Sequence, residues 1–276
     1  MNIRQLKKNW NRFGETDPLW AILTHAGKKG NRWQLDEFFC TGETEVGVIM
    51  DYVHSLGINL LRSKALDFGC GVGRLTQALA NYFGEVDGVD IAPSMIRLAK
   101  RYNRHPRNCK YYLNTRADLR LFGDATFDFI YTSITLQHME PRYTKAYLKE
   151  FLRLLSPEGV LIFNLPTGPI LPPEAQDGGT KAKEDQRERT NAIEGKNLLA
   201  ITKQFIKSRT PGTIFKVYDF YRSLRAPDFP RIEMYPIKRE EVERFLELNG
   251  ARILGVVQIG IAGREWLSYR YSVAKR

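Results

Sequence analysis

The sequence is poor in cysteine and has no long apolar run. Its 276 residues include three cysteines, Cys40, Cys70 and Cys109, which are widely spaced and form no CxxC pair. An odd and scattered set argues against a disulfide framework or a zinc site. We expect all three thiols to be buried as small hydrophobic groups, as free cysteines usually are. No stretch approaches the ~18 consecutive apolar residues that a membrane helix needs, so we expect no membrane span.

Two further patterns are missing. The first residues, MNIRQLKKNWNRFGE, are polar and basic and lack the apolar core of a secretory signal peptide. We therefore expect the chain to be cytoplasmic. The sequence also has no convincing cluster of acidic side chains of the kind that holds a metal ion, so we expect no metal.

Positive charge is abundant and unevenly distributed. The formal net charge is +11, and residues 180–231 hold twelve Lys or Arg against six Asp or Glu, a balance of +6. A basic surface suits nucleic acid, an anionic membrane surface or acidic small molecules. The function of this segment should therefore differ from that of the rest of the chain.

Strand and helix patterns alternate through the middle of the chain. Short buried strands are predicted at 64–68, 85–91, 109–114, 127–134 and 159–165, with helices at 73–84, 92–103 and 142–156. This alternation is typical of an α/β fold with a doubly wound, mostly parallel sheet. A helix at 238–250 precedes strands at 251–262 and 266–275. Only a short turn separates these two strands, so we expect them to pair antiparallel.

Composition divides the chain into three parts. Residues 1–42 form an aromatic arm, and 43–165 together with 232–276 form the α/β domain. Residues 166–231 form a basic, partly helical insertion, which includes a predicted helix at 197–208. A long segment over the carboxyl edge of a sheet is typical of a lid or a substrate-binding element. The arm either packs into the core or, through EFFCTG (37–42), closes over the site.

The stretch ALDFGCGVGRLTQAL (65–79) places Gly69, Gly71 and Gly73 between a strand and a helix. Glycines there let the backbone approach a ligand, and the next helix offers free N–H groups to negative charge. A dinucleotide fingerprint would read GxGxxG, but the third position is Arg74. The spacing GxGxG thus argues against a pyrophosphate site.

Asp90 ends the second predicted strand, nineteen residues after Gly71. A carboxylate at this place can accept hydrogen bonds from both hydroxyls of a ribose. Because parallel strands present their carboxyl ends at one edge, the loop and this acid should meet there. We infer that the ligand contains a nucleoside.

Four motifs resemble those of the class I S-adenosylmethionine (SAM) dependent methyltransferases. They are LDFGCGVGRL, VDGVDIAPSMIRLAK, FDFIYTSITLQHM and LRLLSPEGVLIFNLP. The resemblance covers 43–165 closely and 238–276 loosely. It implies a Rossmann-like sheet of seven strands with the last one antiparallel, SAM as cofactor and S-adenosylhomocysteine as product.

The resemblance also implies which residues hold the cofactor. Asp67 and the loop Gly69, Cys70, Gly71 and Gly73 would line the methionyl part, and Asp90 would bind the ribose. Ile91 and Met95 would enclose the adenine, and Asn114, Ala117 and Asp118 would lie at its edge. Other roles stay open for three of them: Asp67 as a helix cap, Met95 as core and Asp118 as an exposed loop acid.

His138, in TLQHMEP, is the candidate catalytic base. It follows the fourth predicted strand, whose carboxyl end points into the site, and the usual pKa of imidazole suits proton abstraction. The alternative is that His138 only shapes the pocket; Tyr131 and Glu140 are weaker candidates. In the insertion, Tyr218, Arg222 and Arg225, with Lys216, are the candidate substrate-binding residues, unless they form a solvated basic surface.

The resulting prediction is an enzyme that methylates an oxygen or nitrogen atom of a small molecule. An anionic or glycosylated metabolite, such as a sugar, would suit the basic and aromatic insertion. An RNA methyltransferase is the alternative that the charge suggests, although no RNA-binding module is recognisable. A non-catalytic SAM-binding protein and a Rossmann oxidoreductase are further alternatives, and the oligomeric state stays open.

Overall fold

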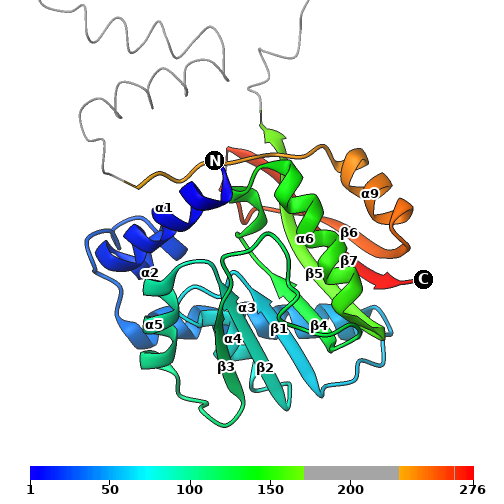
Figure 1. Cartoon of the computed structure of the whole chain (residues 1–276), viewed down its shortest axis with the longest axis horizontal. Coiled ribbons are helices and arrows are strands. Elements are labelled where there is room, and N and C mark those ends of the chain that lie inside the picture. Colours follow the sequence, from blue (N-terminus) through cyan, green and yellow to red (C-terminus); the bar gives the residue numbers. More distant parts are fainter. Residues whose placement is uncertain (171–229, 264) are drawn as a thin grey trace, which may run out of the picture. The chain divides into compact units, whose positions relative to one another are not determined.

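A single sheet forms the centre of the part of the chain that the structure describes. The computed structural model describes residues 1–170, 230–263 and 265–276, and within them seven strands pair in the order β3-β2-β1-β4-β5-β7-β6 (Figure 1). The strands are β1 (Lys64–Phe68), β2 (Glu85–Asp90), β3 (Cys109–Leu113), β4 (Phe127–Thr132), β5 (Leu155–Pro169), β6 (Ala251–Ile259) and β7 (Trp266–Lys275).

The pairing directions confirm the predicted fold class. β1 lies between β2 and β4 and is parallel to both, and β2–β3 and β4–β5 are parallel as well. β7 lies between β5 and β6 and is antiparallel to each. The strand order reverses at β1, so the carboxyl ends of β1, β2 and β4 frame the point where ligands bind in doubly wound sheets.

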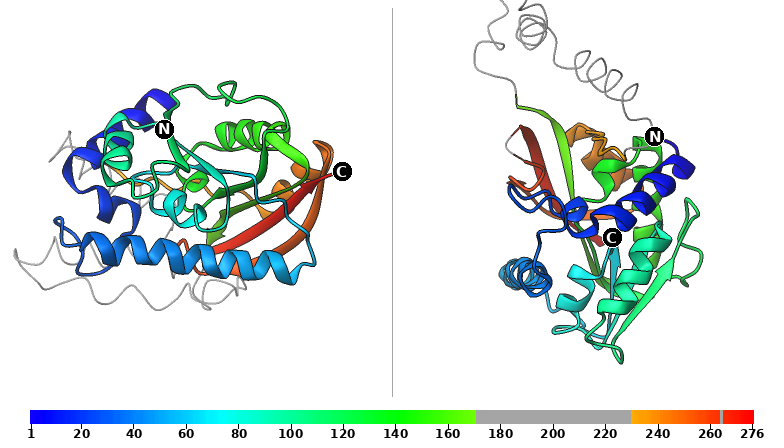
Figure 2. Two further views of the ribbon diagram at one scale, coloured as in Figure 1. Left: turned by 90° about the horizontal axis from the view of Figure 1, so that it is seen from below. Right: turned by 90° about the vertical axis from the view of Figure 1, so that its left-hand side faces the viewer.

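Helices cover both faces of this sheet (Figure 2). They are α1 (Ile3–Thr16), α2 (Pro18–Ile22), α3 (Leu35–Ser55), α4 (Arg74–Leu79), α5 (Pro93–Tyr102), α6 (Pro141–Leu154) and α9 (Arg239–Leu248). Side chains of α3, α4 and α5 pack with Ala65 and Phe129, while those of α6 and α9 pack with Leu66 and Ile130. Neighbouring residues of one strand thus enter opposite cores, as the period of a strand requires. Among the helices of the described residues, none is long and apolar enough to cross a membrane.

The aromatic arm packs against the sheet domain. Phe13, Trp33 and Phe38 form a third core cluster together with Val72 and Met95. Helix α3 begins at Leu35 and runs to Ser55, through the boundary placed after residue 42. Continuous helix therefore joins the arm to the domain. The three-part division of the chain stays a prediction.

Several predicted details differ from the structure. α4 ends at Leu79, whereas the pattern predicted a helix to residue 84. β5 continues to Pro169 because its pairing with β7 extends to Trp266, whereas we expected a loop from residue 166. Cys70 and Cys109 are buried as expected, but Cys40 is exposed, because it lies on the outer face of α3. The helix expected at 197–208 lies outside the described residues.

Candidate active site

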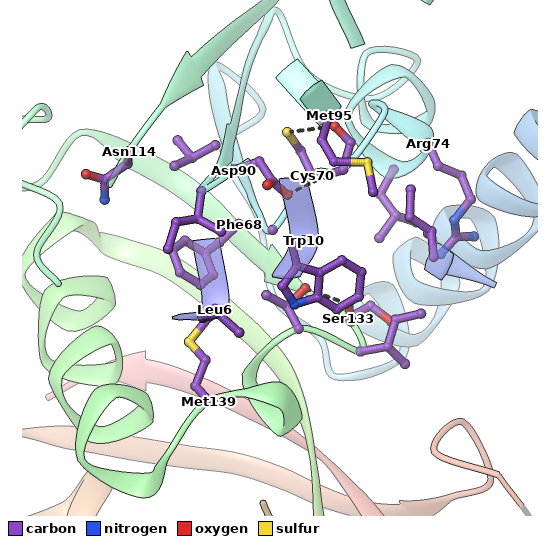
Figure 3. Close-up of a pocket in the computed structure, with 18 of the residues that line it drawn as sticks. Leu6, Trp10, Phe68, Cys70, Arg74, Asp90, Met95, Asn114, Ser133 and Met139 are labelled. Carbon is purple, nitrogen blue, oxygen red and sulfur yellow. Dashed lines mark hydrogen bonds between the residues drawn. The ribbon is translucent and has the colours of Figure 1, made fainter. Parts of the chain in front are cut away.

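A pocket opens where the carboxyl ends of the central strands meet. Its walls come from the loop after β1, the ends of β2 and β3, the segment after β4, and the arm helices α1 and α2. In Figure 3, Asn114 and Arg74 lie on opposite sides of Asp90, with Trp10 in front of it. The glycine loop and Asp90, which sequence reasoning placed at one edge, are therefore brought together.

The glycine loop has a backbone that disfavours other residues. Gly69, Gly71 and Gly73 have φ values of +79°, +53° and +88°, in the left-handed region that glycine adopts without strain. A Cβ at Gly71 would lie 2.6 Å from Ile22 Cδ1, and Cβ atoms at the other two would overlap Thr135 and Tyr111. Gly69 and Gly71 line the pocket, whereas Gly73 faces Tyr111. Side chains of the protein thus account for part of the glycine requirement.

The Asp90 carboxylate is fixed by backbone N–H groups. Oδ2 accepts a hydrogen bond of 2.9 Å from Gly71 N–H, and Oδ1 accepts one of 2.8 Å from Ala92 N–H. Burial raises the pKa of Asp90 to about 6, and the backbone hydrogen bonds oppose that rise. Each carboxylate oxygen has a second lone pair, so this acid can still accept hydrogen bonds from a diol.

Asp67 lies beneath the loop and is absent from the pocket lining. Its Oδ2 accepts a hydrogen bond of 2.6 Å from Thr76 Oγ1, and its Oδ1 has no hydrogen-bond partner among the described residues. The side chain is 1% exposed, and burial raises the pKa of this carboxyl to about 7. This hydrogen bond joins β1 to α4. Because the donor is the Thr76 side chain and not a backbone N–H, Asp67 does not cap the helix.

The residues expected around an adenine divide into two groups. Ile91, Met95 and Asn114 line the pocket, as does Cys70 in the glycine loop. Ala117 and Asp118 are not among the lining residues. The Asn114 amide donates a hydrogen bond of 2.6 Å to the Asp118 carbonyl, and the Asp118 carboxylate accepts one of 3.1 Å from Arg116, which lowers its pKa.

Arg74 and Glu45 form a buried ion pair that sequence reasoning missed. The distance from Arg74 Nη2 to Glu45 Oε2 is 2.7 Å, and Glu45 Oε1 accepts a 2.7 Å hydrogen bond from the Tyr131 hydroxyl. Burial acts to raise the pKa of Glu45, but the Arg74 charge and hydrogen bonds from Ser133 and Tyr131 outweigh it and lower the pKa. Arg74 lines the pocket, and its Nε is buried without a partner in the described residues. An arginine directly after the glycine loop was the available signal.

His138 lies behind the pocket wall. Its Nδ1–H donates a 2.7 Å hydrogen bond to the Glu233 carbonyl, which fixes the tautomer because a carbonyl only accepts. Its Nε2 lies 3.3 Å from the Gln137 amide nitrogen, and its ring lies 5.4 Å from that of Trp10 between centroids. Burial lowers the pKa of His138, so the imidazole is neutral at neutral pH. Trp10 lines the pocket, whereas His138 does not.

The other candidate residues take different positions. The Tyr131 hydroxyl is bonded to Glu45, and burial raises its pKa. Glu140 forms an ion pair of 2.9 Å with Arg142. Tyr218, Arg222 and Arg225, with Lys216, lie outside the described residues, so their role stays a prediction.

The arm contributes to the pocket through residues other than those expected. Leu6 and Trp10 of α1 and Ile22 of α2 line it, whereas Phe38 and Phe39 of the segment 37–42 are packed in the core. The apolar spacing of residues 1–22 indicates that these side chains are buried, but it does not tell whether they line a pocket or belong to the core.

Comparison with known proteins identifies the domain. Residues 65–159 match the family described as methyltransferase domain. Residues 65–159 therefore form a methyltransferase domain of the SAM-dependent kind. The glycine loop and Asp90 lie within the matched residues.

Curated relatives match part of the chain. A 2-methyl-6-phytyl-1,4-hydroquinone methyltransferase of Synechocystis sp. is 26% identical over 160 residues, which is 55% of this chain and 47% of the relative. A ubiquinone biosynthesis O-methyltransferase of Xanthomonas oryzae pv. oryzae is 30% identical over 118 residues, or 42% of this chain and 48% of the relative. The chain thus spans about half the length of the curated relatives it matches.

A solved structure shares the fold of this chain. Magnesium protoporphyrin IX methyltransferase from Synechocystis PCC 6803, crystallised with bound SAH, has a TM-score of 0.59 and 17% identity, and the match covers 100% of both chains. At this identity the likeness extends to the fold alone.

Proposed function

We propose that this protein transfers the methyl group of SAM to a hydroxyl oxygen of a small molecule built on an apolar ring system. The observation that carries the proposal is the pocket in which the glycine loop meets Asp90 at the switch point of the sheet. Transfer to nitrogen is the second possibility for the same site. The reaction needs the acceptor and the methyl group in line.

The residues of the pocket suit the cofactor. Asp90 would accept hydrogen bonds from the ribose hydroxyls, and Ile91 and Met95 would enclose the adenine. At the opposite end, Arg74 has a buried Nε without a partner among the described residues, which suits the carboxylate of the methionyl part. When bound, SAM supplies a methyl group already activated on a sulfonium.

The protein would then contribute alignment and water exclusion. Holding two reactants in line is worth roughly 7–11 kcal/mol of the barrier. Leu6, Trp10 and Met139 give the pocket an apolar wall that would keep water from the reacting atoms. A hydroxyl acceptor must lose a proton, and His138 is the candidate base. The Glu233 carbonyl holds its Nδ1–H, so Nε2 is the basic atom, and it would have to exchange the Gln137 amide, 3.3 Å away, for the acceptor hydroxyl.

The proposed class of methyl acceptor rests on the apolar wall of the pocket and on the two curated relatives. Trp10, Ile134 and Met139 offer flat or apolar surface, which suits an aromatic ring better than a sugar. The two curated relatives are named for hydroquinone and ubiquinone chemistry, so they lend no support to the RNA alternative. We therefore replace the sugar of the first prediction with a phenolic or quinol-type acceptor.

Calorimetry and labelled methyl transfer test this function. We expect SAM to bind with measurable heat and NAD to give none, and label from SAM to enter phenolic or quinol acceptors in preference to sugars. Asp90→Ala should weaken SAM binding at least tenfold, whereas Asp124→Ala, an exposed acid far from the pocket lining, should leave it unchanged. Absence of SAM binding to the wild type would refute the proposal.

A further inference from the structure

Polar side chains gather at the end of β5 and the start of β7, on the face that α3 covers. Asn164 of β5 lies directly opposite Arg270 of β7, and Ser268 lies two residues away on the same face of β7. Arg270 lies 5.8 Å from the centre of the Tyr52 ring of α3. We call Asn164, Ser268 and Arg270 the β5–β7 polar cluster.

Each member of the β5–β7 polar cluster has a buried atom without a hydrogen-bond partner among the described residues. These atoms are Asn164 Oδ1, Ser268 Oγ and Arg270 Nε. Asn164 is 1% exposed and Ser268 is fully buried. Leaving a buried polar atom unpaired is costly, and native proteins do so rarely. Three such atoms on one face of two paired strands therefore indicate a group that binds there.

The charge of Arg270 is also uncompensated. Within the described residues, Arg270 takes part in no ion pair, whereas Arg74, on the same side of the sheet, is paired with Glu45 at 2.7 Å. The two guanidinium groups and the Glu45 carboxylate give this region a formal balance of +1. Arg270 is half-buried, and a guanidinium forms its strongest hydrogen bonds with an ionised acceptor, so the missing group should be an anion.

The cluster is one side chain away from the pocket. The Asn164 amide nitrogen donates a hydrogen bond of 3.2 Å to Ser133 Oγ, and Ser133 lines the pocket (Figure 3). β4 and β5 lie on the opposite side of β1 from β2 and β3, which carry Asp90 and Asn114. A group bound at the cluster would therefore lie away from the nucleoside end of the pocket.

We propose that the β5–β7 polar cluster binds a carboxylate carried by the methyl acceptor, an inference that rests on the proposed function. Arg270 Nε–H and the Ser268 hydroxyl are available as donors to the two carboxylate oxygens. The Asn164 amide stays hydrogen-bonded to Ser133 Oγ, so it takes no part in holding the carboxylate. Charge-assisted hydrogen bonds of this kind are the strong ones. The acceptor is then an acidic phenol or quinol.

Binding of a matched pair of probes tests the inference. With the full chain loaded with S-adenosylhomocysteine, 3,4-dihydroxybenzoate and 4-methylcatechol are titrated by calorimetry; the two differ in a carboxylate against a methyl group. We expect wild type to prefer the carboxylate at least tenfold. Arg270→Met should abolish the preference, and Ser268→Ala should reduce it about threefold. Arg252→Met, which removes an exposed arginine of β6, should retain it.

The outcomes separate this inference from the proposed function. Equal affinity for both probes in the wild type, no saturable binding of either, or an unchanged preference in folded Arg270→Met would each overturn it. If that variant does not fold, Ser268→Ala decides by the same criterion. Inorganic phosphate is also tested as a competitor of 3,4-dihydroxybenzoate. If it binds the cluster as tightly as that probe, the cluster is a phosphate site and the proposed carboxylate is refuted. Failure to bind SAM or to transfer methyl would instead refute the proposed function, and the titration would then be run without S-adenosylhomocysteine.

Discussion

At the scale of single residues, buried charge is concentrated around the glycine loop. Arg74 is 3% exposed, and its partner Glu45 also holds the Tyr131 hydroxyl. Removing one partner of a buried pair leaves the other charge without compensation, which costs far more than the net contribution of the pair. Arg74 lines the end of the pocket that we propose for the methionyl part of the cofactor.

Arg74→Met should lower the free energy of unfolding by about 3 kcal/mol, because Glu45 would remain buried and unpaired. The double variant with Glu45→Gln should recover part of that loss. Urea unfolding followed by circular dichroism measures both changes. A loss below about 1 kcal/mol in the single variant would contradict the ion pair, and Arg252→Met serves as the exposed control.

Asp67 should make stability depend on pH. Its folded pKa, raised by burial to about 7, exceeds the usual value near 3.9, so the folded state binds more protons than the unfolded state between about pH 4 and 7. Stability should therefore fall as the pH rises through this window. Asp67→Asn should flatten the slope and make the protein more stable than wild type at pH 8.

Urea unfolding at pH 5, 6, 7 and 8 measures the free energy of unfolding of wild type and of Asp67→Asn. The difference between the two proteins at each pH tests the prediction. Asp90, whose pKa is raised to about 6, contributes a slope of the same sign in both proteins and cancels in that difference. Parallel pH profiles of the two proteins would show that Asp67 does not titrate in this range.

His138→Asn tests the candidate base. If the imidazole accepts the proton of the acceptor hydroxyl, the rate of methyl transfer should fall by roughly 10²–10⁴-fold, with SAM affinity changed less than twofold. The acidic limb of the pH–rate profile should disappear as well. A merely structural role predicts the opposite pattern, in which stability falls and the pH profile keeps its shape.

At the scale of elements, α1 is hydrogen-bonded both to α5 and to the backbone of Arg231. The Asn11 carboxamide oxygen accepts a hydrogen bond of 2.9 Å from Ser94 N–H, in the first turn of α5, where Ala92 has no side chain to cap the helix. Two residues away, Asn9 exchanges two hydrogen bonds with the backbone of Arg231. A helix of the arm thus caps the helix that presents Met95 to the pocket.

Asn11→Ala should therefore destabilise the protein by about 1 kcal/mol, the usual cost of losing a cap. It should also increase the rate at which SAM dissociates, because α5 begins beside the proposed adenine site. Thermal unfolding and stopped-flow fluorescence measure the two effects. Asn59→Ala, in an exposed loop, is the matched control, and equal behaviour of both variants would contradict the cap.

At the scale of the whole molecule, the pocket is assembled from segments far apart in the sequence. Leu6 and Met139 face the same space as Asp90, so a ligand there should stabilise the folded chain as a unit. SAM at 100 times its dissociation constant should add about 2.7 kcal/mol to the free energy of unfolding. NAD should add nothing, and a SAM effect absent from thermal unfolding would contradict the site.

Periodicity and turn chemistry predicted the fold well, because the strands from Lys64 onward are short, buried and bounded by glycine and proline. The meeting of Asp90 with the glycine loop followed from topology alone. Other features depended on contacts between distant segments, which a local pattern does not carry. Sequence reasoning therefore missed the pairing of Arg74 with Glu45, the place of Trp10 in the wall and the shielding of His138 behind it.

The position of β7 has a consequence for the order in which the sheet assembles. β7 follows β6 in the chain but separates it from β5, so among the described strands β6 has no partner until β7 has paired with β5. Until then the edge of β5 is open and the sheet can go no further than five strands. An open strand edge invites pairing with another chain, so substitutions that weaken β7 should increase aggregation during refolding.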